Sequence, residues 1–172
     1  NRVLATKQVS NQEALILFGL LIILSFILLL MLELKIILLA IFSLFLLVIY
    51  PLTKRYFKIP QLILGMAFGS SIPMVFILEK GVIDYNCIIL YISTILWAVV
   101  YDTYYAMADK KDDKKIGIKS SALFFGEKDI KYALNIHLFV LFCFILLGLM
   151  NSYGLLYYLF LLISLLSVIY QH

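Results

Sequence analysis

The stretch LYISTILWAVVYDTYYAMADKKDD, residues 90–113, joins an apolar segment directly to a cluster of charged side chains. Its first eleven residues, up to Val100, carry no charge, whereas the part from Asp102 to Asp113 holds four aspartates. No glycine or proline interrupts the stretch, so a helix that begins in the apolar part can continue through the charged part. A helix with this pattern is typical of a membrane span whose end emerges into water.

The rest of the chain has the composition of a membrane protein. Of its 172 residues 65% are hydrophobic and 14% are charged, and the mean hydropathy is +1.07. A spanning helix needs about 20 apolar residues, and six windows qualify: 14–32, 36–51, 61–78, 84–101, 132–150 and 153–170. Apolar segments continue to the end of the chain, which excludes a secreted protein with a cleaved signal peptide. We therefore predict an all-α, multi-pass transmembrane helix bundle that forms a single domain over residues 1–172.

The distribution of basic residues predicts how the chain crosses the bilayer. The net charge is +4, but the lysines and arginines lie in short loops beside apolar segments, which argues against a nucleic-acid partner. If the six windows span the membrane, twelve of the fourteen basic residues fall on one side. The positive-inside rule makes that side cytoplasmic.

Smaller signals predict where the helices begin, end and bend. Ser10 and Glu13 have the spacing of a capping box for the first span. Residues 50–60, YPLTKRYFKIP, are expected to form a loop, because Pro51 and Pro60 limit how far the neighbouring helices can run. The segment GMAFGSSIP, residues 65–73, predicts a kinked or tightly packed helix, and either a lining role or ordinary packing explains its small residues.

The charged cluster contains an acidic face. At about 100° per residue, Asp102, Asp109 and Asp113 fall within about 40° of one another, whereas Asp112 lies about 80° from Asp102. Three stacked carboxylates repel one another at the edge of a low-dielectric layer, so the face requires a cation. Magnesium, which prefers oxygen ligands and leaves positions for phosphate oxygens, is the natural candidate.

Basic residues on the same side predict a phosphorylated ligand. Lys54, Arg55 and Lys119 supply donors, and Tyr50 lies four residues before Lys54, so the two are neighbours if that turn is helical despite Pro51. Carboxylates with a divalent cation, opposed by bases at a membrane surface, indicate a diphosphate site whose substrate carries a lipid tail. The alternatives are a solvated charged loop and a cation transporter in which the aspartates bind an ion in transit.

Three segments resemble the UbiA-type intramembrane prenyltransferases. YDTYYAMADKKDD with KIGIKSSALFFG is similar to the second aspartate-rich motif of that family. YPLTKRY resembles the YxxxK segment, and IPQLILGMAFGSSIPM resembles the LPQ and GxAFGxSIPM pattern. The similarity runs from Asn1 to Tyr170. It implies an all-α bundle in which a polyprenyl diphosphate is ionised with Mg²⁺ and the allyl cation alkylates an aromatic ring.

The resemblance also implies roles for particular residues. Asp109 and Asp113 match metal-binding and catalytic carboxylates, and Asp102 matches a third catalytic aspartate. The KIGIKS and SIPM segments favour family members that act on 4-hydroxybenzoate in ubiquinone synthesis, in the inner membrane of bacteria. Lys111 replaces an acid common in the second motif. The positions that match substrate-binding residues are Tyr50, Lys54, Arg55, Ser71 and Lys119.

Other residues carry weaker expectations. Trp97 and Tyr105 are candidates to stabilise the allyl cation with their ring faces, and membrane packing is the alternative for both. His137 lies within an apolar window, where we expect an interhelical hydrogen bond. Cys87 and Cys143 match no metal or disulfide spacing and are expected to be packing residues.

One departure from the family pattern concerns the start of the chain. The segment NRVL at residues 1–4 resembles a family segment that follows the first aspartate-rich motif. We therefore expect this chain to be a fragment truncated at both ends, which lacks one of the two carboxylate clusters that hold magnesium. If so, either a separate chain supplies the missing helices or the fragment is catalytically inactive.

Overall fold

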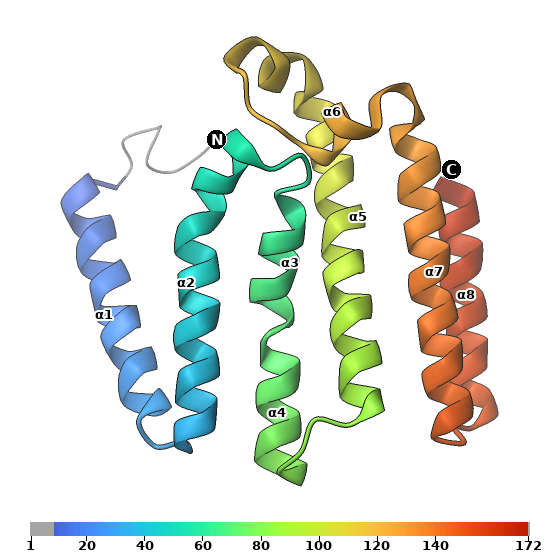
Figure 1. Cartoon of the computed structure of the whole chain (residues 1–172), viewed down its shortest axis with the longest axis horizontal. Coiled ribbons are helices and arrows are strands. Elements are labelled where there is room, and N and C mark those ends of the chain that lie inside the picture. Colours follow the sequence, from blue (N-terminus) through green and yellow to red (C-terminus); the bar gives the residue numbers. More distant parts are fainter. Residues whose placement is uncertain (1–8, 172) are drawn as a thin grey trace. The chain divides into compact units, whose positions relative to one another are not determined.

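The computed structural model describes residues 9–171, apart from the side chain of Gln171, and the NRVL segment lies outside them. Every regular element in the described part is helical, as predicted. The elements are α1 (Asn11–Leu29), α2 (Leu34–Tyr56), α3 (Gln61–Gly69), α4 (Ser71–Lys80), α5 (Tyr85–Ile116), α6 (Ser121–Phe125), the 3₁₀ turn η1 (Gly126–Lys128), α7 (Asp129–Met150) and α8 (Leu155–Gln171) (Figure 1).

Two compact units divide the described part of the chain, with the boundary between Leu38 and Leu39. In the first unit, α1 begins with the predicted capping box: Ser10 Oγ accepts a hydrogen bond from Glu13 N, and Ser10 N donates to Glu13 Oε2 over 2.9 Å. None of the residues of α1 is buried. The start of the helix is fixed by this cap.

In the second unit, α5 is the central helix, and α3 and α7 pack along it (Figure 1). Two glycines let α3 approach closely. A Cβ atom on Gly65 would lie 2.8 Å from Ile95 O, and one on Gly69 would lie 2.9 Å from the Tyr91 ring. Small residues four apart are a common helix-packing device in membranes. The prediction of tight packing at residues 65–73 is confirmed.

The same segment is also interrupted, between α3 and α4. Ser70 separates the two helices, and its hydroxyl donates to Ser43 Oγ over 2.7 Å. Ser43 Oγ in turn donates to Ala67 O over 3.1 Å. These hydroxyl groups satisfy backbone and side-chain polar atoms at the break, which is how membrane helices tolerate an irregular turn.

The expected loop from Tyr50 to Pro60 was wrong over most of its length, because α2 passes through Pro51 and ends only at Tyr56. Proline removes one backbone donor but fits a membrane helix when neighbouring polar groups compensate. Thr53 Oγ1 donates to Tyr50 O over 2.6 Å in the same turn, whereas the acceptor that Pro51 frees is Leu47 O, four residues before the proline. The consequence is that Tyr50 and Lys54 do lie on one helical face.

Helix α5 continues through the charged cluster, as predicted, and ends at Ile116. Its 32 residues span about 48 Å at about 1.5 Å per residue, so it exceeds a hydrocarbon core of about 30 Å. Gly117 ends the helix with φ +71°, a left-handed conformation that glycine adopts without strain. The chain then turns back toward α2 and α3.

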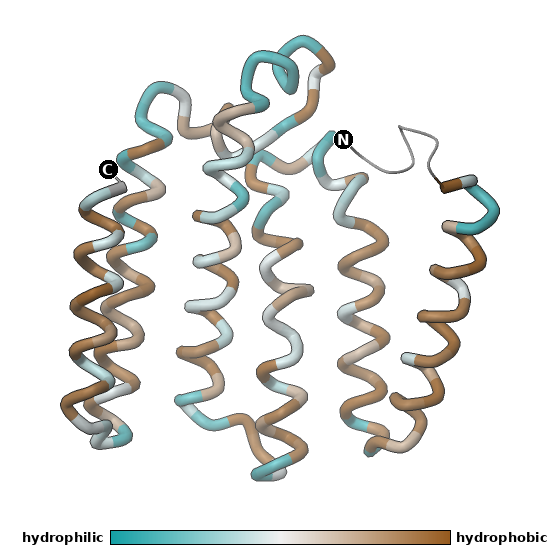
Figure 2. Tube along the Cα trace, turned by 180° about the vertical axis from the view of Figure 1, so that it is seen from behind, coloured by the Kyte–Doolittle hydropathy of each residue, from teal (hydrophilic) through white to brown (hydrophobic). Residues whose placement is uncertain are grey.

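Among the described residues, five helical stretches are long and apolar enough to cross a membrane, and α8 is a shorter apolar helix. Figure 2 shows long apolar stretches along these helices, while hydrophilic residues gather in the connection after α5. The chain is a multi-pass membrane protein. The five stretches are Asn11–Leu29, Leu34–Tyr56, Gln61–Lys80, Tyr85–Ile116 and Ser121–Met150.

Candidate functional site

A small pocket of about 80 Å³ lies beside the charged end of α5. Its walls come from α2, α3, α5 and the segment that follows α5, so residues far apart in the sequence meet there. We call it the polar pocket. Its lining residues are Lys54, Gln61, Asp102, Tyr105, Ala106, Asp109, Asp113, Ile118, Lys119 and Ser120.

The acidic wall of the polar pocket is the face predicted from helical spacing. Asp102, Asp109 and Asp113 all line it from α5. Asp112 does not, and instead forms an exposed ion pair with Lys115 at 2.9 Å. The prediction that three of the four aspartates share a face is therefore confirmed.

The basic wall is held by backbone contacts between α2 and the segment after α5. Lys119 N donates to Lys54 O over 2.8 Å, so the two lysines become neighbours although 65 residues separate them. Lys119 Nζ donates to Tyr56 O over 3.0 Å. Lys54 Nζ lies 5.1 Å from the centre of the Tyr50 ring, close enough for a cation–π interaction.

The charges of the polar pocket are not used in ion pairs. Among residues 9–171 three ion pairs occur: Lys80–Asp84, Lys110–Asp129 and Lys115–Asp112. None of them includes a residue that lines the pocket. Two lysines and three aspartates thus surround one small space without neutralising one another directly, which favours a ligand with both anionic and cationic parts.

Three other residues that the sequence analysis singled out do not line the polar pocket. Tyr50 contacts it indirectly, since its hydroxyl lies 3.5 Å from Asp102 Oδ2. Arg55 is exposed on the last turn of α2. Ser71 is exposed at the start of α4, where its hydroxyl donates to Phe68 O over 3.4 Å. The binding roles expected for Arg55 and Ser71 remain predictions.

Sequence reasoning missed Gln61, which lines the polar pocket although it is only 2% exposed. Its Oε1 accepts a hydrogen bond from Ser121 N over 3.3 Å. Ser121 Oγ also lies 2.5 Å from Thr103 Oγ1, so this polar network ties α3, α5 and α6 together. The available signal was that Gln61 carries the one polar side chain in the segment QLILGMAFG.

The donor set suits magnesium only in part. No group of three or more His, Cys, Asp or Glu side chains within the described ranges is placed to hold a metal ion together. Mg²⁺ commonly binds through one or two carboxylates and completes its shell with water and phosphate oxygens. Asp109 and Asp113, one turn apart on α5, fit that mode when a phosphorylated ligand is present.

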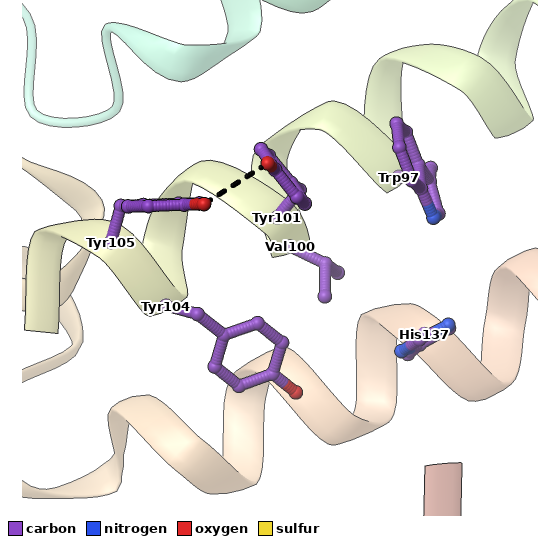
Figure 3. A pocket seen from close by; sticks show the side chains of 6 residues that line it. All are labelled: Trp97, Val100, Tyr101, Tyr104, Tyr105 and His137. Carbon is purple, nitrogen blue, oxygen red and sulfur yellow. Dashed lines mark hydrogen bonds between the residues drawn. The ribbon is translucent and has the colours of Figure 1, made fainter. Parts of the chain in front are cut away.

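A larger cavity, of about 490 Å³, borders the same helix and is shown in Figure 3. We call it the aromatic cavity. Rings of α5 follow one another along it, with centroids 5.4 Å apart for Trp97 and Tyr101 and 5.0 Å apart for Tyr101 and Tyr105. Tyr105 lines both this cavity and the polar pocket. The full lining is Trp97, Val100, Tyr101, Tyr104, Tyr105 and His137.

The segment between α5 and α7 is anchored at its far end by Lys110. Its Nζ donates to Gly126 O and lies 2.8 Å from Asp129 Oδ2. Asp129 is 8% exposed, and a partly buried ion pair of this kind is costly to break on one side only. It therefore fixes the start of α7 against α5, next to the aspartates of the pocket.

These features define a multi-pass, all-α membrane protein with an acidic and basic pocket at one end of its central helix. The sequence matches the model of the UbiA prenyltransferase family over residues 1–172, and the chain belongs to that family. No solved structure matches it.

Curated relatives are similar along nearly the whole chain. A 4-hydroxybenzoate octaprenyltransferase of Haemophilus ducreyi is 41% identical over 99% of this chain and 61% of its own length. Relatives with the same name from Citrobacter koseri and Pseudomonas syringae are 43% and 42% identical, over 99% and 95% of this chain and 59% and 55% of their own lengths. The chain thus spans little more than half of each relative.

Proposed function

We propose that the chain carries part or all of an enzyme that transfers a polyprenyl group from polyprenyl diphosphate to the ring of 4-hydroxybenzoate. The observation that carries the proposal is the polar pocket, where two lysines and three aspartates surround one space without forming ion pairs, next to the aromatic cavity. The family to which the chain belongs and the names of the chain's relatives support this reaction over cation transport.

In this proposal, the pocket works by electrostatic stabilisation of the leaving group. The bond between the allylic carbon and the diphosphate oxygen breaks, and its electron pair leaves with the diphosphate. Lys54 and Lys119 line the pocket and stabilise the charge that develops on the phosphate oxygens. Arg55, exposed one residue further along α2, contributes long-range positive charge to the same region.

Asp109 and Asp113 would hold Mg²⁺ in the presence of diphosphate, and the ion would supply neutralising charge for the leaving group. The two carboxylates would also keep the diphosphate at the basic wall by setting where its counter-ion sits. Their one-turn separation on the rigid helix α5 fixes this arrangement before the substrate arrives.

The aromatic ring attacks the allyl cation, a carbon–carbon bond forms, and the ring proton is lost to a base. Tyr105, which borders both cavities, would face the cation, and Trp97 lies two turns away along the aromatic cavity. Asp102 is our candidate for the base, since it lines the pocket and contacts the Tyr50 hydroxyl.

We further propose that the protein resides in the inner membrane of a bacterium and serves ubiquinone synthesis, with the polar pocket on the cytoplasmic side. The relatives are bacterial, and most basic residues lie on the pocket side of the predicted spans.

A membrane assay tests the proposal. Membranes that contain this chain, its Asp109→Ala variant or the H. ducreyi relative would receive labelled polyprenyl diphosphate and 4-hydroxybenzoate, with and without Mg²⁺. We expect magnesium-dependent product from the chain and none from the variant. Product from the relative but none from this chain would show that the chain alone is not a transferase.

A further inference from the structure

We propose that Gln61 binds the diphosphate directly, through its amide NH₂ group. This inference rests on the proposed function, because it assigns one more binding residue to the same pocket. Gln61 is the first residue of α3, it is 2% exposed, and it lines the polar pocket. A buried polar side chain at such a position requires partners for each of its polar atoms.

The orientation of the amide follows from its hydrogen bond. The partner is the backbone N–H of Ser121, which is a donor, so the Gln61 atom at 3.3 Å must be the oxygen. The oxygen is thereby engaged, and the NH₂ group is left as the part of the side chain that can donate to the contents of the pocket. A donor held in this way is pre-organised and loses little freedom on binding.

The surroundings decide which ligand atom the NH₂ group would meet. The carboxylates of Asp109 and Asp113 line the pocket from α5. The hydrogen-bond donors come from other elements, and they are Gln61, Lys54 and Lys119. Anionic oxygens are the ligand atoms that two ammonium groups and an amide NH₂ recognise together. Gln61 therefore adds an uncharged, directional donor to two flexible point charges.

The competing explanation is that Gln61 only holds Ser121 in place, and two substitutions separate these roles. Gln61→Glu keeps an oxygen that accepts the Ser121 N–H but replaces the NH₂ group by a second acceptor. Gln61→Leu removes both the donor and the acceptor without adding charge. Asn86→Asp is the matched control, because it makes the same amide-to-carboxylate change near the other end of α5.

The experiment is titration of the full chain, in lipid nanodiscs, with inorganic diphosphate and Mg²⁺ by calorimetry. Hydrogen exchange of the Ser121 amide reports whether the local structure is kept. We expect Gln61→Glu and Gln61→Leu each to weaken binding roughly 10-fold to 100-fold. Asn86→Asp should bind as the wild type does, and Gln61→Glu should keep the Ser121 amide protected.

Wild-type affinity in Gln61→Glu would overturn the proposal, and so would weaker binding in Gln61→Leu alone with loss of Ser121 protection. Both results would make Gln61 a positioning residue. If the wild-type chain binds no diphosphate and Asp109→Ala changes nothing, the proposed diphosphate site itself fails, and the role of Gln61 fails with it. The two kinds of failure are thus distinguishable.

Discussion

The two ends of α5 carry similar polar residues, but the residues at one end bond to one another and the charged residues at the other end do not. Near its start, a cavity of about 220 Å³ is lined by Lys80, Asn86 and Asn151 among other residues. Lys80 pairs with Asp84 at 2.9 Å, and the two asparagine amides hydrogen-bond reciprocally over 3.2 and 2.9 Å. Near the other end, the lysines and aspartates of the polar pocket form no ion pair with one another.

This comparison separates polar groups that stabilise the fold from polar groups that form a candidate binding site at the edge of a membrane. At the start of α5 the polar groups satisfy one another, cap the helix and join it to the end of α7, so they serve folding. In the polar pocket the lysines and aspartates form no ion pair with one another, and we propose that they bind an external ligand. Charged side chains of both signs that gather around one space without pairing with one another are a sign of binding.

The largest expected effect comes from removing the acidic wall. Changing both Asp109 and Asp113 to Asn should weaken binding of diphosphate with Mg²⁺ by roughly 100-fold or more, because both carboxylates that would hold the cation are lost. Calorimetry with the chain in nanodiscs measures the affinity for diphosphate. Asp84→Asn is the matched control at the opposite end and should bind as the wild type does. Equal affinity in all three proteins would contradict the assignment of the acidic wall.

The basic wall should contribute less per residue. Lys54→Gln should weaken diphosphate binding about 10-fold, since one of two ammonium groups is removed and the other remains. Lys80→Gln, which breaks an ion pair at the opposite end, should leave the affinity unchanged. If the two variants lose affinity equally, the effect would reflect general surface charge rather than a local contact, and added salt would then abolish it.

At the opposite end, substitution should affect stability rather than binding. Asn151→Ala removes the partner of Asn86 and a hydrogen bond to Leu147 O, at a cost of about 1 kcal/mol in the free energy of unfolding. Unfolding by denaturant in detergent measures this cost. Diphosphate affinity should change less than twofold. A larger loss of affinity than of stability would show that the two ends of α5 are coupled.

The smallest effect concerns pH. Lys80 donates to the Asp84 carboxylate, and the Cys87 N–H donates to it as well, so the pKa of Asp84 lies below its usual value. A carboxyl whose pKa is lower in the folded state stabilises the fold above its unfolded pKa and loses that contribution as the pH falls through the folded value. The Tm of the wild type should therefore drop more steeply below about pH 4 than that of Asp84→Asn. Parallel curves would contradict this role.

Much of the fold was predictable because a bilayer imposes length and hydropathy on each span. The apolar windows correspond to the helices, and the continuation of α5 through residues 102–113 follows from the absence of any glycine or proline there. Pro51 misled the prediction, since a proline rule drawn from water-exposed helices underestimates what a membrane helix tolerates.

The polar pocket was predictable only in its acidic half. Helical spacing placed three aspartates on one face, but spacing within one helix says nothing about which distant residues approach it. Lys119 reaches Lys54 because Gly117 turns the chain back, and Gln61 faces the pocket because two glycines bring α3 against α5. Both are tertiary contacts; the contact between Lys119 and Lys54 has no local signal in the sequence, and the one signal for Gln61 is its polar side chain in an apolar segment.

The measurement that tests the central claim most directly is hydrogen exchange of the chain in nanodiscs, with and without diphosphate and Mg²⁺. Binding at the polar pocket should slow exchange in residues 109–121 and leave residues 81–87, at the paired end of α5, unchanged. Slower exchange at residues 81–87, or no change at 109–121 under conditions where calorimetry detects binding, would contradict the claim that the unpaired charges form the ligand site.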